Sequence, residues 1–210
     1  KGKPMQERQV LALATNPPEN VTVFFSDGSS LENGDGGTGF TVQAPGRQRE
    51  DFASFLGKVD NNEAEMEALR GCLSRLLQLN RLIGLEGTVV GFSDSAVCLG
   101  YLLKGWKCPT GTQLGRGTRK LLHEVQTRFR LRMYWVRGHS GLEGNERADG
   151  LARDGAEGKE YGPGADTPPP YTASPFSTGP GQGFTDFDAN CDAEAPATRA
   201  GEAGAAGGTE

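Results

Sequence analysis

The sequence predicts an α/β domain in which one mixed β-sheet carries helices on its faces. Three stretches with strand-like patterning come first, and helical stretches then alternate with two further strands. This order of elements indicates an antiparallel meander, extended by strands that helical crossovers join.

The first three predicted strands lie close together in the chain. Residues 21–26 (VTVFFS) form a β-branched and aromatic run, and residues 37–44 and 52–59 follow across turns that contain Gly, Pro and Asn. Short turns of this kind join antiparallel neighbours, so these strands are expected to form the meander.

The longest predicted helix covers residues 62–80, where Met66, Leu69, Leu73 and Leu76 recur at helical spacing. The later elements are a strand at 87–93, helices at 95–103 and 113–129, a strand at 131–136 and a helix at 144–156. Because crossover helices cover the faces of such a sheet, these later strands are expected to be buried.

The two ends of the chain differ in composition from its middle. Residues 158–210 are rich in Gly, Pro and Ala, with 2 basic and 8 acidic side chains, and we expect them to be a disordered acidic tail. Residues 1–19 are predicted to be a linker or an extension of an upstream domain, although Leu11 and Leu13 could dock on the core. The folded domain is therefore expected over residues 20–157.

Composition also excludes several classes of protein. The 4 cysteines lie far apart without a C-x-x-C pair and only 2 histidines are present, so neither a zinc centre nor a disulfide framework is implied. No run of about 18 apolar residues and no signal peptide is seen. We expect an intracellular protein, nuclear or cytoplasmic, with no membrane partner.

One segment of the chain is strongly basic. Between residues 104 and 137, nine basic side chains accompany a single acid, Glu124. They are Lys104, Lys107, Arg116, Arg119, Lys120, Arg128, Arg130, Arg132 and Arg137. Such a patch can attract phosphates, and the alternative is an ordinary solvated helix face.

Two predicted strands end in an aspartate. Asp27 ends an apolar row on the first strand, and Asp94 ends the matching row on the fourth, each within the string Phe-Ser-Asp. Open α/β sheets place their sites at the carboxyl ends of the strands, so the two acids indicate a site there. Turn chemistry for Asp27 and helix capping for Asp94 are the alternatives.

The helix that follows the meander adds a third acid. At about 100° per residue, Glu65 falls within the apolar stripe of this helix, whereas Glu63 and Glu67 fall on its wet side. Burying a carboxylate is costly unless cations or strong donors meet it. Glu65 is therefore a site candidate, and a buried ion pair is the alternative.

A fourth acid, Asp149, lies at the edge of the packed side of the last helix, where a surface position is the default interpretation. Several acids without a cluster of His or Cys favour hard cations such as Mg²⁺ or Mn²⁺. Such ions suggest phosphate chemistry, in which two cations activate a water and stabilise the leaving oxygen.

Four strings resemble the type 1 ribonucleases H, in order and at family spacing. They are FFSDGSS, NNEAEMEAL, GFSDSAVCLGYL and WVRGHSGLEGNERADGLAR. The resemblance implies a ribonuclease H-like five-stranded mixed sheet of order 3-2-1-4-5, with strands 1–3 antiparallel and helices on both faces. It also implies cleavage of the RNA strand of RNA/DNA hybrids.

The resemblance further implies roles for individual residues. Asp27 would bridge two Mg²⁺ ions, for which Mn²⁺ can substitute, Asp149 would join it at the ion that activates water, and Glu65 and Asp94 would hold the other ion. His139 would assist turnover or product release, its alternative being an ordinary loop histidine. The RNA contacts would come from Gly28, Ser29, Asn61, Asn62 and Ser95; a helix cap is the alternative for the asparagines.

Two departures from the family pattern concern the substrate. Ala96 stands where cellular enzymes often have Gln, and residues 105–112 are too short for the basic helical handle of bacterial and cellular members. The short connection, the string GHSGLEGNERAD and a start at Lys1 resemble the ribonuclease H domains of non-LTR retrotransposon polyproteins, which implies an upstream reverse transcriptase. A cellular protein or a degenerate genomic copy is the alternative. We expect the domain itself to be monomeric.

Two rival functions remain open from the sequence. A ribonuclease H-like domain can serve as a catalytically weak or inactive nucleic-acid-binding module, but all four acids and His139 are present here, which favours an enzyme. A DNA-cutting relative such as an integrase or a junction resolvase is the other rival. The asparagine pair and the GHSG loop argue against it.

Overall fold

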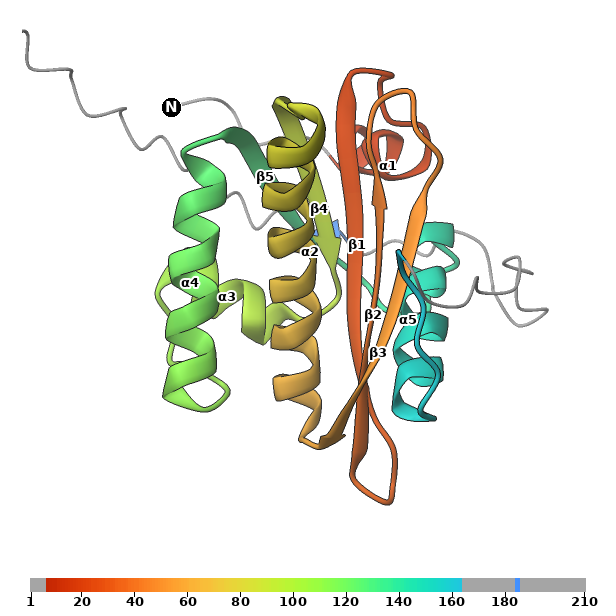
Figure 1. Ribbon diagram of the computed structural model, residues 1–210, viewed down its shortest axis with the longest axis vertical. Helices are drawn as coiled ribbons and strands as arrows, with labels where there is room; N and C mark the ends of the chain where they lie inside the picture. The colour runs from red at the N-terminus through yellow and green to blue at the C-terminus, as the bar shows by residue number, and fades with distance from the viewer. Residues whose placement is uncertain (1–6, 164–183, 186–210) are drawn as a thin grey trace, which may run out of the picture.

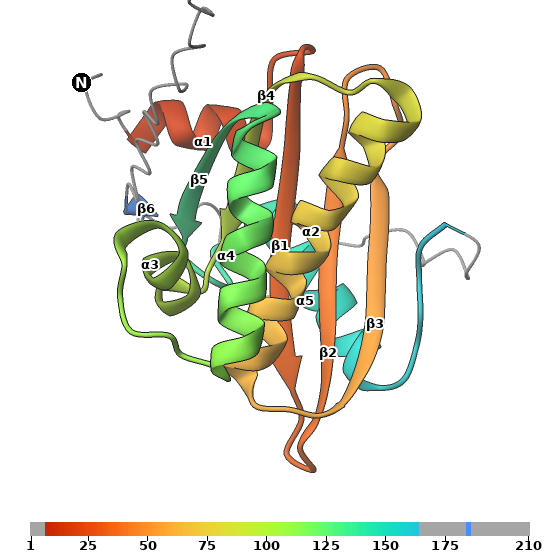
Figure 2. The same ribbon diagram turned by 60° about the vertical axis from the view of Figure 1, so that its left-hand side comes forward.

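The computed structural model describes residues 7–163 and 184–185 (Figures 1 and 2). Its centre is one six-stranded sheet in the order β3-β2-β1-β4-β5-β6. Helices α2, α3 and α4 cover one face of this sheet, while α5 and α1 lie on the other face (Figure 2). The predicted α/β class and the predicted order 3-2-1-4-5 are both confirmed.

The strands pair as the sequence predicts. The antiparallel meander consists of β1 (Val21–Ser30), β2 (Asp35–Gln43) and β3 (Glu50–Lys58). β4 (Gly87–Ser93) runs parallel to β1, and β5 (Phe129–Val136) runs parallel to β4. The carboxyl ends of β1, β4 and β5 therefore meet at the same edge of the sheet.

The helices begin and end at clear local signals. α2 (Asn61–Ile83) starts with a capping box between Asp60 and Glu63, and Gly84 in the left-handed conformation follows its last residue. The crossover helices are α3 (Ala96–Lys104), α4 (Thr112–Gln126) and α5 (Glu143–Ala156). Each lies within four residues of its predicted bounds.

The core is divided by the sheet into two layers. On β1, Phe24 is fully buried against the layer of α2, whereas Val23 and Phe25 belong to the layer of α5 and α1. This alternation follows from the two-residue period of a strand. The buried neighbours on β1 therefore determine to which face of the sheet the polar and charged side chains at its end point.

The chain ends differ in part from the expectation. Within the predicted linker, residues Glu7–Thr15 form helix α1, whose Val10 is only 2% exposed and packs with the α5 layer. Within the predicted tail, Phe184–Thr185 forms β6, which pairs antiparallel with the end of β5, and Tyr161 forms a bridge with Ala53. Residues 1–6, 164–183 and 186–210 lie outside the described residues.

Candidate active site

The parallel pairing of β1 and β4 brings two predicted acids together. Ser26 lies opposite Ser93 in the register of these strands, and Asp27 and Asp94 are the residues that follow them. The rings of Phe25 and Phe92, one step earlier on each strand, stack at 4.9 Å. β1 continues through Asp27 to Ser30, so Asp27 is held inside the sheet rather than in a turn.

A glycine allows α2 to deliver the third acid to this edge. The backbone of α2 presses against Gly28, where an added Cβ would lie 2.1 Å from the Glu65 nitrogen and 2.2 Å from the Ala64 carbonyl carbon. Glu65 is 6% exposed, like Asp27, whereas Glu63 and Glu67 are only partly buried. The helical sorting of the three glutamates is thus confirmed.

Asp27, Glu65 and Asp94 form one carboxylate cluster. Each contributes an oxygen, and these oxygens lie within 4.8 Å of one another. Burial, followed by repulsion from Asp94 and Asp149, raises the pKa of Asp27 to about 8. Burial and repulsion from Asp27 also raise the pKa of Glu65 well above its ordinary range. Without a bound cation, the carboxyl groups of Asp27 and Glu65 therefore hold their protons to higher pH than ordinary carboxyl groups do.

The third member of the cluster is oriented by its surroundings. Burial raises the pKa of Asp94, although a hydrogen bond from the side chain of Asn145 opposes this effect. The Trp135 indole donates a 2.8 Å hydrogen bond to the Asp94 carbonyl. At Gly138 an added Cβ would lie 2.5 Å from Asp94 Oδ2, so the loop that follows β5 passes close to this carboxylate.

The fourth predicted acid lies beside the cluster rather than within it. Asp149 on α5 is close enough for its charge to raise the pKa values of Asp27 and Asp94. Its side chain is 22% exposed, and its Oδ2 lies 3.4 Å from Arg153 Nη2. Asp149 thus lies near the other three acids, as the sequence predicts, and it also has an arginine partner, Arg153, one helical turn away.

The remaining predicted site residues surround the acids to differing degrees. His139 is exposed, with a left-handed φ of 52°, in the loop between β5 and α5, and its charge acts on Asp94. Asn61 and Asn62 are exposed on the first turn of α2. Ser95 is 8% exposed and precedes α3.

The glycine and serine after Asp27 are placed differently from each other. The Gly28 amide donates a 2.8 Å hydrogen bond to Asp27 Oδ1, and the residue is buried beneath α2. Ser29 is only partly buried. Gly28 therefore helps to hold Asp27 and Glu65 in place. Of Gly28 and Ser29, Ser29 is the more accessible.

Sequence reasoning missed Asn145. It is 1% exposed and four residues before Asp149, so both lie on the same side of α5. Its Oδ1 has no hydrogen-bond partner within the described part of the chain. The signal available in the sequence was this four-residue spacing from a predicted acid.

The donor set fits a hard divalent cation. Glu65 Oε2 is buried and has no hydrogen-bond partner among the described residues, and it belongs to the carboxylate cluster. An acid in that state is costly unless a proton or a cation compensates its charge. The three clustered ligands are all carboxylates, which favours Mg²⁺ or Mn²⁺ over zinc.

Solved structures with the same fold include several ribonucleases H. Ribonuclease H1 from Halobacterium salinarum aligns with a TM-score of 0.52 and 24% identity, over 65% of this chain and 98% of that one. The N-terminal ribonuclease H domain of a Mycobacterium tuberculosis protein aligns with a TM-score of 0.53 and 22% identity, over 65% and 94%. The site described above thus lies in a fold that ribonucleases H adopt.

Sequence comparison identifies the family itself. The family model described as RNase H matches residues 19–157. A curated ribonuclease H from Acidovorax sp. is 32% identical over 146 residues, which is 66% of this chain and 96% of that protein. The ribonuclease H of Hyphomonas neptunium is 31% identical over 144 residues, 66% and 94%. The chain belongs to the ribonuclease H family, and its enzymatic activity is that of a ribonuclease H.

Along the residues that the structure describes, no helix combines the length and the apolarity needed to cross a bilayer.

Proposed function

We propose that this enzyme hydrolyses the RNA strand of RNA/DNA hybrids by two-metal-ion catalysis. The observation that carries the proposal is the buried cluster of Asp27, Glu65 and Asp94, in which Glu65 Oε2 lacks a partner among the described residues. Two structures with the same fold, LC11 ribonuclease H1 and a foamy viral protease-reverse transcriptase, are complexes with RNA/DNA hybrid, which supports this choice of substrate.

Four carboxylates would hold the two ions. Asp27 would contact both, with Asp149 at one and Glu65 and Asp94 at the other. When bound, such a pair activates a water molecule and stabilises the leaving oxygen at phosphorus. The protein would contribute orientation: Trp135 and Asn145 hold Asp94, and the close approach at Gly28 sets Asp27 beside Glu65.

Substrate contacts are proposed along the rim of the cluster. Asn61 and Asn62 are exposed on the first turn of α2, the helix that carries Glu65, so they can reach a strand lying across the acids. Ser29 and Ser95, with the backbone at Gly28, complete the proposed set for the RNA strand. His139, on an exposed loop near Asp94, would assist turnover or product release.

The basic segment supplies a second proposed contact with nucleic acid. Arg116 and Lys120 are exposed on α4, and the Arg119 guanidinium lies 3.9 Å over the Tyr101 ring. Only seven residues, 105–111, connect α3 to α4, so no additional helix occurs between them. We infer that exposed charges on α4 take over part of the electrostatic attraction that a helical handle would provide.

The same short connection supports an origin in a retroelement. In that case a reverse transcriptase would lie upstream in the same polyprotein, and the ribonuclease H domain would act as a monomeric unit within it. Sequencing of the full transcript tests this. An in-frame reverse transcriptase upstream of Lys1 supports the origin, and a complete cellular reading frame without one contradicts it.

Cleavage of a labelled hybrid tests the catalytic proposal. The full chain should cut the RNA strand of an RNA/DNA duplex in the presence of Mg²⁺ or Mn²⁺ and should leave double-stranded RNA and double-stranded DNA intact. Undiminished cleavage in excess chelator would refute the metal assignment. Binding of the hybrid without cleavage under any divalent cation would instead identify an inactive binding module.

A further inference from the structure

We propose that the ion pair between Asp51 on β3 and Arg147 on α5 positions Asp149 for the reaction. The inference rests on the proposed function, because it takes Asp149 to be one of the acting carboxylates. Neither Asp51 nor Arg147 belongs to the carboxylate cluster, and both would act only through the position of α5.

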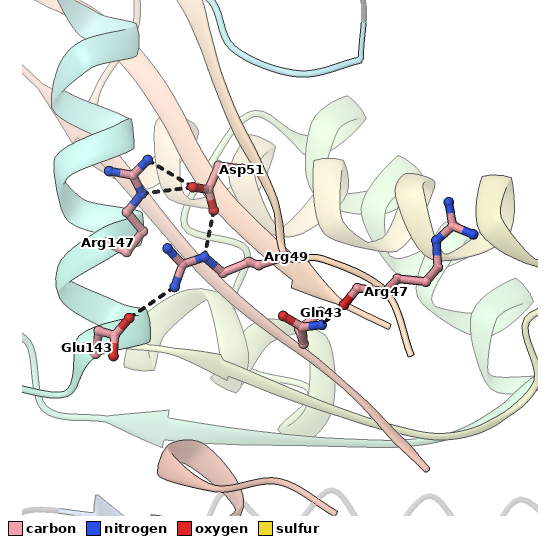
Figure 3. Close-up of polar contacts among 6 residues, drawn as sticks. All are labelled: Gln43, Arg47, Arg49, Asp51, Glu143 and Arg147. Carbon is pink, nitrogen blue, oxygen red and sulfur yellow. Dashed lines mark hydrogen bonds and ion pairs between the residues drawn. The ribbon is translucent and has the colours of Figure 1, made fainter. Parts of the chain in front are cut away.

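The pair is the centre of a polar network that links β3 to α5 (Figure 3). Arg147 places two nitrogens on Asp51 Oδ2, with Nε at 3.0 Å and Nη2 at 2.9 Å. The other oxygen, Oδ1, accepts from Arg49 Nε at 3.0 Å, and Arg49 Nη1 continues to Glu143 Oε1 at 3.1 Å. Arg147 thus links α5 to Asp51 on β3, and Glu143, one helical turn earlier, links it to Arg49, the residue just before β3.

The residues of α5 that form ion pairs lie on the opposite side of the helix from Asn145 and Asp149. Glu143 and Arg147 are four residues apart, and so are Asn145 and Asp149, with an offset of two residues between the two pairs. Two residues correspond to about 200° around a helix. Asn145 and Asp149 therefore face Asp94, while Glu143 and Arg147 lie on the opposite side of the helix. A rotation of α5 would move Asp149 and Asn145 toward or away from Asp94.

Part of the surface of α5 packs on sheet positions that carry no side chain. α5 lies on glycines of β2: a Cβ at Gly39 would lie 2.1 Å from the Ala152 nitrogen, and one at Gly37 would lie 2.0 Å from the Ala156 nitrogen. Such a contact is close but offers no side chain from these two sheet positions to interlock with the helix. The ion pair supplies the directional restraint that these positions lack.

The pair is also well shielded from water. The Arg147 and Asp51 side chains are 9% and 12% exposed. Removal of the Asp51 charge leaves the buried Arg147 guanidinium without its ion-pair partner, so the local geometry must rearrange, whereas Asp51 also pairs with Arg49. Supporting groups of this kind typically change activity or metal affinity by about 10- to 100-fold when they are removed.

Asp51→Asn is the main test, and the neighbouring residue provides its matched control. Glu50 also forms an ion pair from β3 to a helix, but on the other face, with Arg75 of α2 at 2.8 Å and 2.7 Å. Asp51→Asn should lower the turnover of hybrid about 10-fold or more and weaken Mn²⁺ binding in calorimetric titration of the full chain. Glu50→Gln should leave both unchanged at a temperature where both variants are folded.

A double-mutant comparison separates positioning from a general loss of stability. If Asp51 acts through Asp149, Asp51→Asn should cause no further loss of turnover or Mn²⁺ affinity in an Asp149→Asn background. Equal losses in both backgrounds, or equal effects of Asp51→Asn and Glu50→Gln, would overturn the proposal. An active Glu65→Gln variant would instead refute the proposed function, which keeps the two failures distinguishable.

A second variant covers the case in which Asp51→Asn does not fold. The double substitution Asp51→Asn with Arg147→Gln removes both charges together, so no uncompensated buried charge remains from the pair. Its thermal unfolding should be closer to that of the parent protein, while its turnover should stay reduced about 10-fold or more. Parent-like turnover and parent-like Mn²⁺ affinity in this variant would contradict a positioning role.

Discussion

Gly28 on β1 lies directly against the Glu65 backbone on α2, so closely that a Cβ at position 28 would be 2.1 Å from the Glu65 nitrogen. Because this Cβ would clash with backbone atoms of α2, no side-chain rotation can relieve the contact. Gly28→Ala should displace the first turns of α2 and reduce hybrid cleavage about 10-fold or more. The expected loss of stability is about 1–3 kcal/mol, measured by denaturant unfolding.

A glycine on an exposed helix surface provides the control for that substitution. Gly117 on α4 has open space at its Cβ position, so Gly117→Ala should leave cleavage unchanged. It should also raise the free energy of unfolding by up to about 1 kcal/mol, because alanine favours helices. Equal effects of the two substitutions would show that the contact at Gly28 has no special importance.

Glu65 and Glu67 allow a test of the site on a single helix. Glu65→Gln removes a buried carboxylate from the cluster and should reduce metal-dependent hybrid cleavage by about 100-fold or more. Glu67 pairs with Arg70 at 3.1 Å on the helix surface, so Glu67→Gln should stay within about twofold of the parent rate. Steady-state cleavage of one labelled hybrid measures both, and comparable losses would contradict the assignment.

The sequence predicted most of this fold because each element carries a local signal that its packing reinforces. The row of Val23 and Phe25, and the stripe of Met66 and Leu69, specify the faces that become buried. α1 was missed because a nine-residue helix with only Val10 fully buried has a weak periodic signal. β6 is two residues long, below the length at which strand patterning can be recognised.

Asp27, Glu65 and Asp94 were predictable because each lies on or at the end of an apolar row, where a carboxylate is costly, whereas Asp149 was indicated only by the family resemblance. The groups that orient them were not, since their importance depends on tertiary contacts. Asp51 pairs with Arg147 across 96 positions of the chain, and Trp135 reaches Asp94 across 41. No local pattern in the sequence links either pair.

The raised pKa of Asp27 predicts a pH dependence of stability in the absence of metal. This carboxyl has a pKa of about 8 in the fold, against an ordinary value of 3.8. Well below pH 4 this carboxyl is protonated in both the folded and the unfolded chain, so it does not reduce the stability of the fold. As the pH rises toward 8, only the unfolded chain releases the proton readily, so the folded state loses stability.

Asp27→Asn should remove the loss of stability that the metal-free protein shows as the pH rises toward 8. In chelator at about pH 8, the variant should melt a few degrees above the parent, since 1 kcal/mol corresponds to about 2–4 °C, and the difference should vanish near pH 4. Added Mg²⁺ should raise the melting temperature of the parent more than that of the variant. Scanning fluorimetry measures these shifts. A variant that melts below the parent at pH 8 in chelator would contradict the electrostatic account.

The basic surface of α4 predicts a salt-dependent substrate affinity. Arg116 and Lys120 are exposed on this helix, so Arg116→Gln with Lys120→Gln should raise KM for the hybrid and leave kcat within about twofold. The slope of log KM against log salt should fall by about one for each phosphate that the variant no longer neutralises. Arg8→Gln changes an exposed charge on α1, which packs with the layer of α5, and should change neither quantity. If the α4 variant keeps the parent KM and salt slope, this helix does not contact the substrate, and the attraction must come from elsewhere on the protein.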